Sequence, residues 1–100
     1  MKAVSKAIAT IGTRHRLEII CALLAKGPSN FNELKRVLGM NSTTLSRTLK
    51  FLEGRGIIKR NVINERPVSV SYSLTTIGQS FSDVMECMDR WGKKLAKTSA

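Results

Sequence analysis

The residues best suited to chemistry lie in the segment 42–55, where cations and hydroxyl groups share one side of an expected helix. At about 100° per residue, three leucines at 45, 49 and 52 fall on a side that would be buried. The outward side and its flanks carry no acid before Glu53 and consist of Thr43, Thr44, Ser46, Arg47 and Lys50. An arginine fork can grip guanine O6 and N7, and hydroxyls can bond phosphates or bases. The pattern favours a DNA contact; the alternative is an ordinary solvated helix face.

A second group of cations lies in the hairpin expected after this helix. Residues 57–62 and 68–74 predict two strands around the turn 64–67, and the second strand alternates apolar residues with serines, which predicts one half-buried face. Lys59, Arg60 and Arg66 make the ribbon basic. Arg66 lies at the tip beside Pro67, where an arginine can enter a minor groove. Its alternative role is a salt bridge with Glu65.

Residue types that serve catalysis are sparse. His15 is the only histidine and lies between two arginines, where a surface or phosphate-contact role is more common than that of a base or ligand. The acids at 83, 86 and 89 share one helix, and no glycine-rich phosphate loop is present. Cys21 and Cys87 lie in apolar helical patterns, so we expect two buried thiols. We therefore expect no enzyme, no cofactor and no bound metal.

Composition supports a polyanionic partner. The chain has 100 residues, enough for one domain, with 17 Lys and Arg against 7 acids and a net charge of +10. Such a charge suits DNA, RNA or an anionic membrane, whereas the alternative is a protein with surplus lysine. The longest apolar run, residues 19–25, is far shorter than the roughly 18 residues of a membrane helix. The first residues lack a signal-peptide core, so we expect a cytoplasmic protein.

The elements that must position these groups follow from apolar spacing and from helix caps. We expect a helix over residues 2–11, a second helix ended by Gly27-Pro28, and a third capped by Asn32 and ended by Gly39. Met40-Asn41 would form the turn before the helix 42–55. Residues 30–75 thus predict a helix-turn-helix followed by a wing at 60–70, in a mainly α, α+β domain. One long helix, capped by Thr75 or Thr76, is expected over residues 76–97.

The two terminal helices carry apolar residues that the compact motif has little room to cover. In the last helix these are Phe81, Val84, Met85, Met88, Trp91 and Leu95; in the first they are Val4, Ile8 and Ile11. An exposed apolar stripe of this length usually marks an interface, so we expect a homodimer built from both helices. The alternative is that both helices fold back on their own domain.

Five blocks in this order resemble the HxlR-type winged-helix transcription regulators of the MarR-like superfamily. They are residues 31–36, 45–53, 56–60, 72–78 and Trp91-Gly92. The resemblance implies a dimer joined through its terminal helices. It also assigns operator binding to Ser42, Thr43, Thr44, Ser46, Arg47, Lys50 and the hairpin tip. No cysteine precedes Cys21, whereas many members carry a reactive cysteine near the N-terminus. Pro67 is followed by Val68 and Ser69, whereas the family's wing usually has paired prolines followed by a basic residue.

The sequence therefore predicts a homodimeric, sequence-specific DNA-binding regulator. Two other hypotheses stay open: an architectural protein that coats DNA without sequence choice, and a winged-helix module that binds other proteins. The operator, the target genes, the effector, the sign of regulation and the redox activity of Cys21 and Cys87 are not specified by the sequence.

Overall fold

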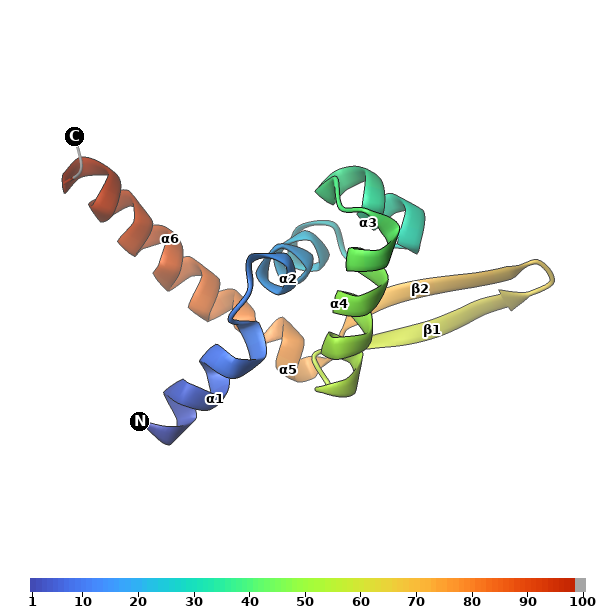
Figure 1. The fold of residues 1–100 in the computed structure, drawn as a ribbon, viewed down its shortest axis with the longest axis horizontal. Helices are drawn as coiled ribbons and strands as arrows, with labels where there is room; N and C mark the ends of the chain where they lie inside the picture. Colours follow the sequence, from blue (N-terminus) through green and yellow to red (C-terminus); the bar gives the residue numbers. More distant parts are fainter. Residues whose placement is uncertain (99–100) are drawn as a thin grey trace.

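Six helices and one β-hairpin make up the computed structural model, which describes residues 1–98 (Figure 1). The elements are α1 (Lys2–Ile11), α2 (Arg14–Lys26), α3 (Phe31–Leu38), α4 (Ser42–Gly54), β1 (Ile58–Glu65), β2 (Val68–Leu74), α5 (Thr76–Gln79) and α6 (Phe81–Thr98). In Figure 1 the hairpin projects from one end of the molecule, and α1 and α6 diverge from the other end. The longest dimension is 53 Å. The mainly α, α+β winged-helix architecture predicted from the sequence is confirmed.

The helix-turn-helix consists of α3 and α4, which are fixed by their caps. Asn30 accepts a hydrogen bond from Glu33 N at 2.8 Å, and the Glu33 carboxylate accepts one from Asn30 N at 3.2 Å, which completes a capping box. The prediction that Asn32 caps this helix is wrong, because the capping box starts the helix at Phe31 instead. Gly39 ends α3 with φ 66°, a left-handed conformation that favours glycine. Asn41 caps α4 by accepting from Thr44 N at 2.8 Å.

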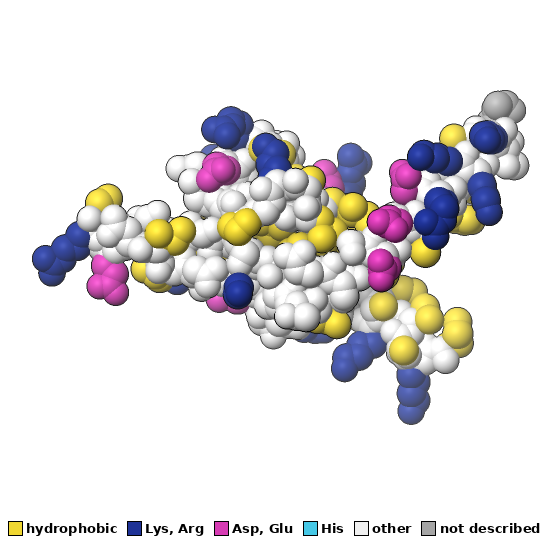
Figure 2. Space-filling model, turned by 180° about the vertical axis from the view of Figure 1, so that it is seen from behind, with side chains coloured by type: hydrophobic (Ala, Val, Ile, Leu, Met, Phe, Trp, Pro, Cys, Tyr) yellow, Lys and Arg dark blue, Asp and Glu magenta, His cyan; other side chains and the backbone are white. Residues whose placement is uncertain are grey.

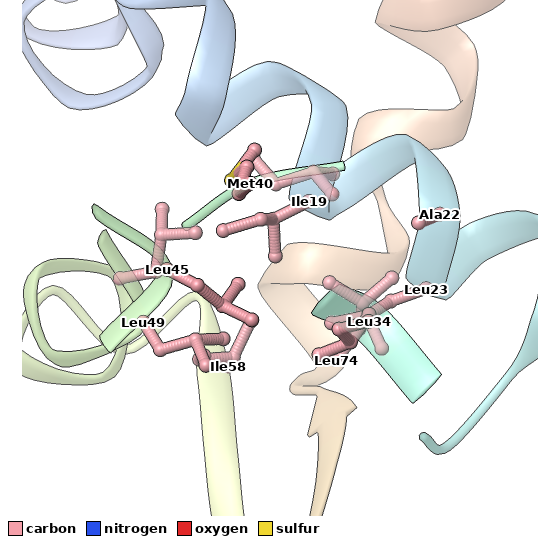
Figure 3. Close-up of a cluster of buried hydrophobic side chains, with 11 residues drawn as sticks. Ile19, Ala22, Leu23, Leu34, Met40, Leu45, Leu49, Ile58 and Leu74 are labelled. Carbon is pink, nitrogen blue, oxygen red and sulfur yellow. The ribbon is translucent and has the colours of Figure 1, made fainter. Parts of the chain in front are cut away.

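A core of aliphatic side chains holds α4 against α2, α3 and the hairpin (Figure 3). From α4 it receives Leu45, Leu49 and Leu52, the three leucines that the helical spacing places on the buried side. The other buried apolar residues are Ile19, Ile20, Ala22, Leu23, Leu34, Met40, Ile58 and Leu74. Because the same leucine row faces inward along α4, the opposite row must face solvent.

The hairpin is longer than the sequence predicts. Residues 63–65 extend β1 towards the tip, with an irregular register between Val62 and Asn64, so Arg66 and Pro67 alone connect the strands. The expectation of one apolar face half-buried along β2 is only partly correct, since Val68 is exposed near the tip and Leu74 is buried at the base. Ser71 is buried too, beside the bridge that Ser29 forms with Tyr72. The hairpin is thus anchored at its base and projects at its tip.

The single C-terminal helix expected over 76–97 is in fact two helices. Thr75 caps α5 by accepting from Gly78 N at 3.2 Å, which confirms one of the two predicted caps. After Gln79 the chain leaves the helix at Ser80, whose hydroxyl donates to the carbonyl of Ile77 at 2.5 Å. A local side-chain bond of this kind competes with helix continuation. The break lets α6 leave the body of the domain in a new direction (Figure 1).

Gly78 allows α5 to approach the segment between α4 and β1 closely. A Cβ at this position would collide with the carbonyl oxygen of Ile57 and would lie 3.0 Å from Leu74 Cδ2. That carbonyl cannot shift freely, because it accepts hydrogen bonds from the backbone and hydroxyl of Thr75 at 3.0 and 3.1 Å. Glycine is therefore required at position 78 because a Cβ atom would not fit there, and not because of the backbone conformation.

We expect Gly78→Ala to lower the free energy of unfolding by about 1–3 kcal/mol, the usual cost of overpacking. Urea unfolding measures this difference. Gly54→Ala is the matched control: its Cβ would meet nothing within 4 Å, and helix propensity favours alanine. Equal midpoints for Gly78→Ala and the wild type would contradict the close packing at this position.

The two terminal helices are the least covered part of the fold. Neither α1 nor α6 contains a buried residue within the described range. Only their inner ends, Ile11 and Phe81, pack against the core. No helix within residues 1–98 is both long enough and apolar enough to cross a membrane.

Candidate nucleic-acid interface

The outward side of α4 brings together the residues that the sequence singles out. Arg47 and Lys50 are exposed, whereas Thr44 and Ser46 are half-buried on the flanks. A shallow hollow on this side is lined by Ser42, Thr43, Ser46, Arg47, Lys50 and Phe31. Small residues at the start of the helix and cations one and two turns later form a surface that fits a DNA major groove.

Phe31 is a residue of this surface that sequence reasoning missed. Phe31 is the first residue of α3 and lies half-buried beside α4. The capping sequence Asn30-x-x-Glu33 was the available signal, since it places the helix start at Phe31. An aromatic edge in such a hollow can contact the methyl group of thymine.

The cations of the wing do not share one face. Lys59 pairs with Ser73 across the ladder and Arg60 pairs with Tyr72, so the two side chains point to opposite faces of the ribbon. Arg66 lies in the two-residue connection at the tip, where its backbone N–H donates to Asn64 Oδ1 at 3.4 Å. One face of the wing and its tip can therefore contact DNA at the same time. Because Lys59 and Arg60 lie on opposite faces, only one of them can join Arg66 in such a contact.

These cations are not neutralised within the described chain. The ion pairs among residues 1–98 are Arg14–Glu18 and Lys93–Asp89, both between residues four apart on a helix. Arg47, Lys50 and Arg66 take part in neither pair, and the predicted alternative of an Arg66–Glu65 bridge does not form. Their charges are available to phosphates, which bind cationic side chains with release of counterions.

The residues expected at a dimer interface lie on the two projecting helices. Hydrophobic side chains are visible along both in Figure 2. The exposed ones are Val4, Ile8, Val84, Met88, Trp91 and Leu95, with Trp91 64% and Ile8 61% exposed. Ile11, Phe81 and Met85 are half-buried. The outer parts of both helices thus keep their apolar surface, while their inner ends pack on the domain.

The two cysteines differ from the expectation that both are buried. Cys87 is exposed, and Arg90 Nη2 donates to its Sγ at 3.1 Å. It lies on the flank of α6, where the projecting helix leaves it in solvent. Cys21 is half-buried, with its Sγ 3.0 Å from Met85 Sδ. Burial, and to a smaller extent the carboxylate of Glu18, raises the pKa of the Cys21 thiol.

An α3–turn–α4 unit, a buried leucine row beneath an exposed basic helix face, and an adjoining basic hairpin define a winged helix-turn-helix protein. The chain belongs to the HxlR-like helix-turn-helix family, whose family model matches residues 10–100. It is therefore a DNA-binding protein of the class that regulates transcription, and the family resemblance drawn from the sequence is confirmed.

Relatives that match this chain in sequence occur in bacteria and archaea. A helix-turn-helix transcriptional regulator of Halalkalibacterium halodurans is 36% identical over 88 residues, which are 87% of this chain and 78% of the relative. One from Methanothermobacter thermautotrophicus is 34% identical over 92 residues, 91% of this chain and 70% of the relative. This chain spans 64% of the length of a third such regulator, YkvN of Bacillus subtilis, at 32% identity.

Solved structures show the same fold. The reduced form of the transcriptional regulator YodB from B. subtilis superposes with a TM-score of 0.82 at 32% identity, covering 94% of this chain and 92% of YodB. The regulator YtcD gives a TM-score of 0.86 at 28% identity, with 97% and 99% covered. The redox regulator HypR in its oxidised form gives 0.78 at 29% identity, with 92% and 95% covered.

Proposed function

We propose that this protein is a homodimeric regulator that binds a specific, two-fold symmetric operator. The observation that carries the proposal is the outward side of α4, where unpaired Arg47 and Lys50 lie beside small hydroxyl residues above a buried leucine row. In the proposed complex α4 (residues 42–54) enters the major groove. Ser42, Thr43, Thr44 and Ser46 contact phosphates or bases near its start.

The wing adds a second contact in this proposal. Arg66 at the tip reaches the minor groove or the backbone, and either Lys59 or Arg60 contacts phosphates, since the ribbon turns them to opposite faces. The long projection of β1 and β2 beyond the body gives the tip the reach that this contact needs (Figure 1).

Dimerisation would cover the apolar helices. A groove between α1 and the α5–α6 segment is lined by apolar residues that include Ala7, Ile77 and Val84. The partner's terminal helices are the proposed occupants, because they present matching apolar stripes and a two-fold axis would repeat the contact. Such a dimer sets the two α4 helices about one DNA turn apart, roughly 34–36 Å.

We do not propose a thiol switch at Cys21. Solved structures of relatives include a quinone-bound YodB and the reduced and oxidised forms of HypR. Here burial raises the pKa of Cys21, which disfavours the thiolate that reacts with oxidants. The proposal also assigns no catalytic step. Because the relatives come from prokaryotes, whose DNA lies in the cytoplasm, we infer a cytoplasmic location.

Selection of bound fragments from random duplex DNA at near-physiological salt tests the proposal. A two-fold symmetric consensus is the expected result. Retention of all sequences with a steep salt dependence would instead establish a non-specific coat protein. No retained DNA at all would favour the protein-interaction module.

Arg66→Ala tests the wing. We expect weaker operator binding and a salt slope that is smaller in magnitude by about 0.9 for each phosphate that a protomer no longer neutralises. The measurement is operator affinity over a series of salt concentrations. Arg14→Ala is the control, because it removes the same charge from an 87% exposed side chain on α2. An unchanged slope and affinity for Arg66→Ala would remove the tip from the interface.

A further inference from the structure

Arg16 joins the terminal helix α1 to the helix-turn-helix. It is the third residue of α2, and its Nη1 donates to the carbonyl oxygens of Ala9 at 3.1 Å and Thr10 at 3.5 Å. Both carbonyls belong to the last turn of α1, where backbone oxygens have no partner within the helix. Gly12 follows with φ −65°, so the chain does not close this end with a left-handed cap. The guanidinium of Arg16 takes the place of that cap.

The same guanidinium also contacts α4, the recognition helix of the proposed DNA complex. Its Cζ lies 3.5 Å from the centroid of the Phe51 ring, which belongs to the last part of α4 and packs against the core. A cation this close to a ring face is attracted by the ring quadrupole, and a half-buried position strengthens the attraction. Arg16 therefore contacts α1 through hydrogen bonds and α4 through a stacked ring, from a backbone position on α2.

The electrostatic setting supports a specific role for this side chain. Arginine in the first turn of a helix faces the positive end of the helix dipole, which by itself is unfavourable. Arg55 follows α4, and its Cζ lies 4.7 Å from the centroid of the same Phe51 ring. It therefore adds a second positive charge close to that of Arg16. The C-terminal ends of α1 and α4 carry partial negative charge, and the two guanidinium groups lie beside these ends. This attraction offsets the unfavourable dipole position of Arg16 and its repulsion with Arg55.

We propose that Arg16 is a positioning residue that couples the orientation of α1 to that of the recognition helix α4. The inference rests on the proposed function, in which α1 belongs to the dimer interface and α4 reads DNA. In that dimer, α1 is fixed by the partner chain. The Ala9–Arg16–Phe51 contact then limits how far α4 can rotate relative to the two-fold axis, and so it sets the spacing between the two recognition helices.

Half-site spacing is the property that this contact should control. A rigid dimer binds half-sites at one separation and discriminates against a site lengthened by one base pair. A dimer with a loosened link between α1 and α4 can adapt to both sites. The ratio of affinities for the two spacings therefore reports the coupling, whereas a general loss of stability weakens both complexes equally.

The experiment compares binding of the full chain to the selected operator and to the same operator with one base pair inserted between its half-sites. Arg16→Lys keeps the charge but removes the planar fork that bonds two carbonyls while stacking on a ring. We expect the affinity ratio to fall by about 2- to 30-fold, the range found for residues along coupling networks. Phe51→Leu keeps an apolar side chain against the core but removes the ring face, so it should lower the ratio in the same way.

Arg14→Ala is the matched control and should keep the wild-type ratio, because Arg14 pairs only with Glu18 at the surface of α2. Equal ratios for the wild type and Arg16→Lys would overturn the coupling while leaving the proposed function intact. Equal weakening on both spacings would also overturn it. A wild type that does not distinguish the two spacings would overturn the dimeric operator complex, and the coupling with it, since α1 would set no spacing.

Discussion

Met88→Asp is expected to convert the protein from dimer to monomer and to abolish tight operator binding. Met88 lies in the exposed stripe of α6, where its side chain is 43% exposed in the single chain. In the proposed dimer the substitution would bury an uncompensated carboxylate from each protomer. An uncompensated buried charge costs about 3–5 kcal/mol, so the dimer should weaken by about 10²- to 10⁴-fold. Operator affinity should fall with it, although Met88 does not lie on the DNA surface.

Sedimentation velocity at micromolar concentration measures this effect. The wild type should sediment at twice the chain mass of 11.1 kDa, and Met88→Asp at the chain mass. Lys97→Ala lowers the net charge by the same unit nine residues further along α6, about 180° round the helix from Met88, and should stay dimeric. A wild-type monomer, or a Met88→Asp dimer with unchanged operator affinity, would contradict the proposed interface.

Arg47→Ala should have the largest effect among the predicted base contacts. A bidentate arginine–guanine contact contributes about 1–3 kcal/mol of discrimination, so specific binding should weaken by about 5- to 150-fold. Preference should relax at one base position in each half-site. Arg47 is exposed opposite the buried Leu45 and Leu49, and it forms no ion pair within the described chain that its removal would also break.

Affinity measured over a panel of operators with single base changes tests this prediction. We expect Arg47→Ala to bind operators with different bases at one position of each half-site with equal affinity. Arg14→Ala should keep the base preferences of the wild type at every position. Equal weakening on every sequence would make Arg47 a phosphate contact. Unchanged binding would place the DNA-reading surface elsewhere on the protein.

The sequence predicts α4 and its exposed side well, because the pattern of apolar and polar residues that defines them is local. The leucine row of α4 fixes which side is buried, and the opposite side follows from helical geometry alone. Helix starts are less certain, because two asparagines two residues apart can both cap a helix. The reciprocal bond between Asn30 and Glu33 selects the first of them. Both residues of that pair are visible in the sequence. Whether Asn30 or Asn32 caps the helix, however, depends on the path of the chain before it.

Features set by contacts between distant segments could not be predicted. The close approach of Gly78 to the carbonyl of Ile57, twenty-one residues earlier, follows from the packing of two separate segments. The contact of Arg16 with Phe51 depends on how α1, α2 and α4 converge, and helical spacing within one element carries no sign of it. The exposure of Cys87 likewise follows from the direction in which α6 leaves the domain, which the apolar pattern of one helix does not determine.

Hydroxyl-radical footprinting of the wild-type protein on its selected operator is the most direct test of a dimeric, sequence-specific regulator. Two protected regions related by two-fold symmetry, with centres about 10–10.5 base pairs apart, are the predicted result. A single protected region, or uniform protection along the fragment, would contradict a dimer that places one α4 helix in each of two successive major grooves.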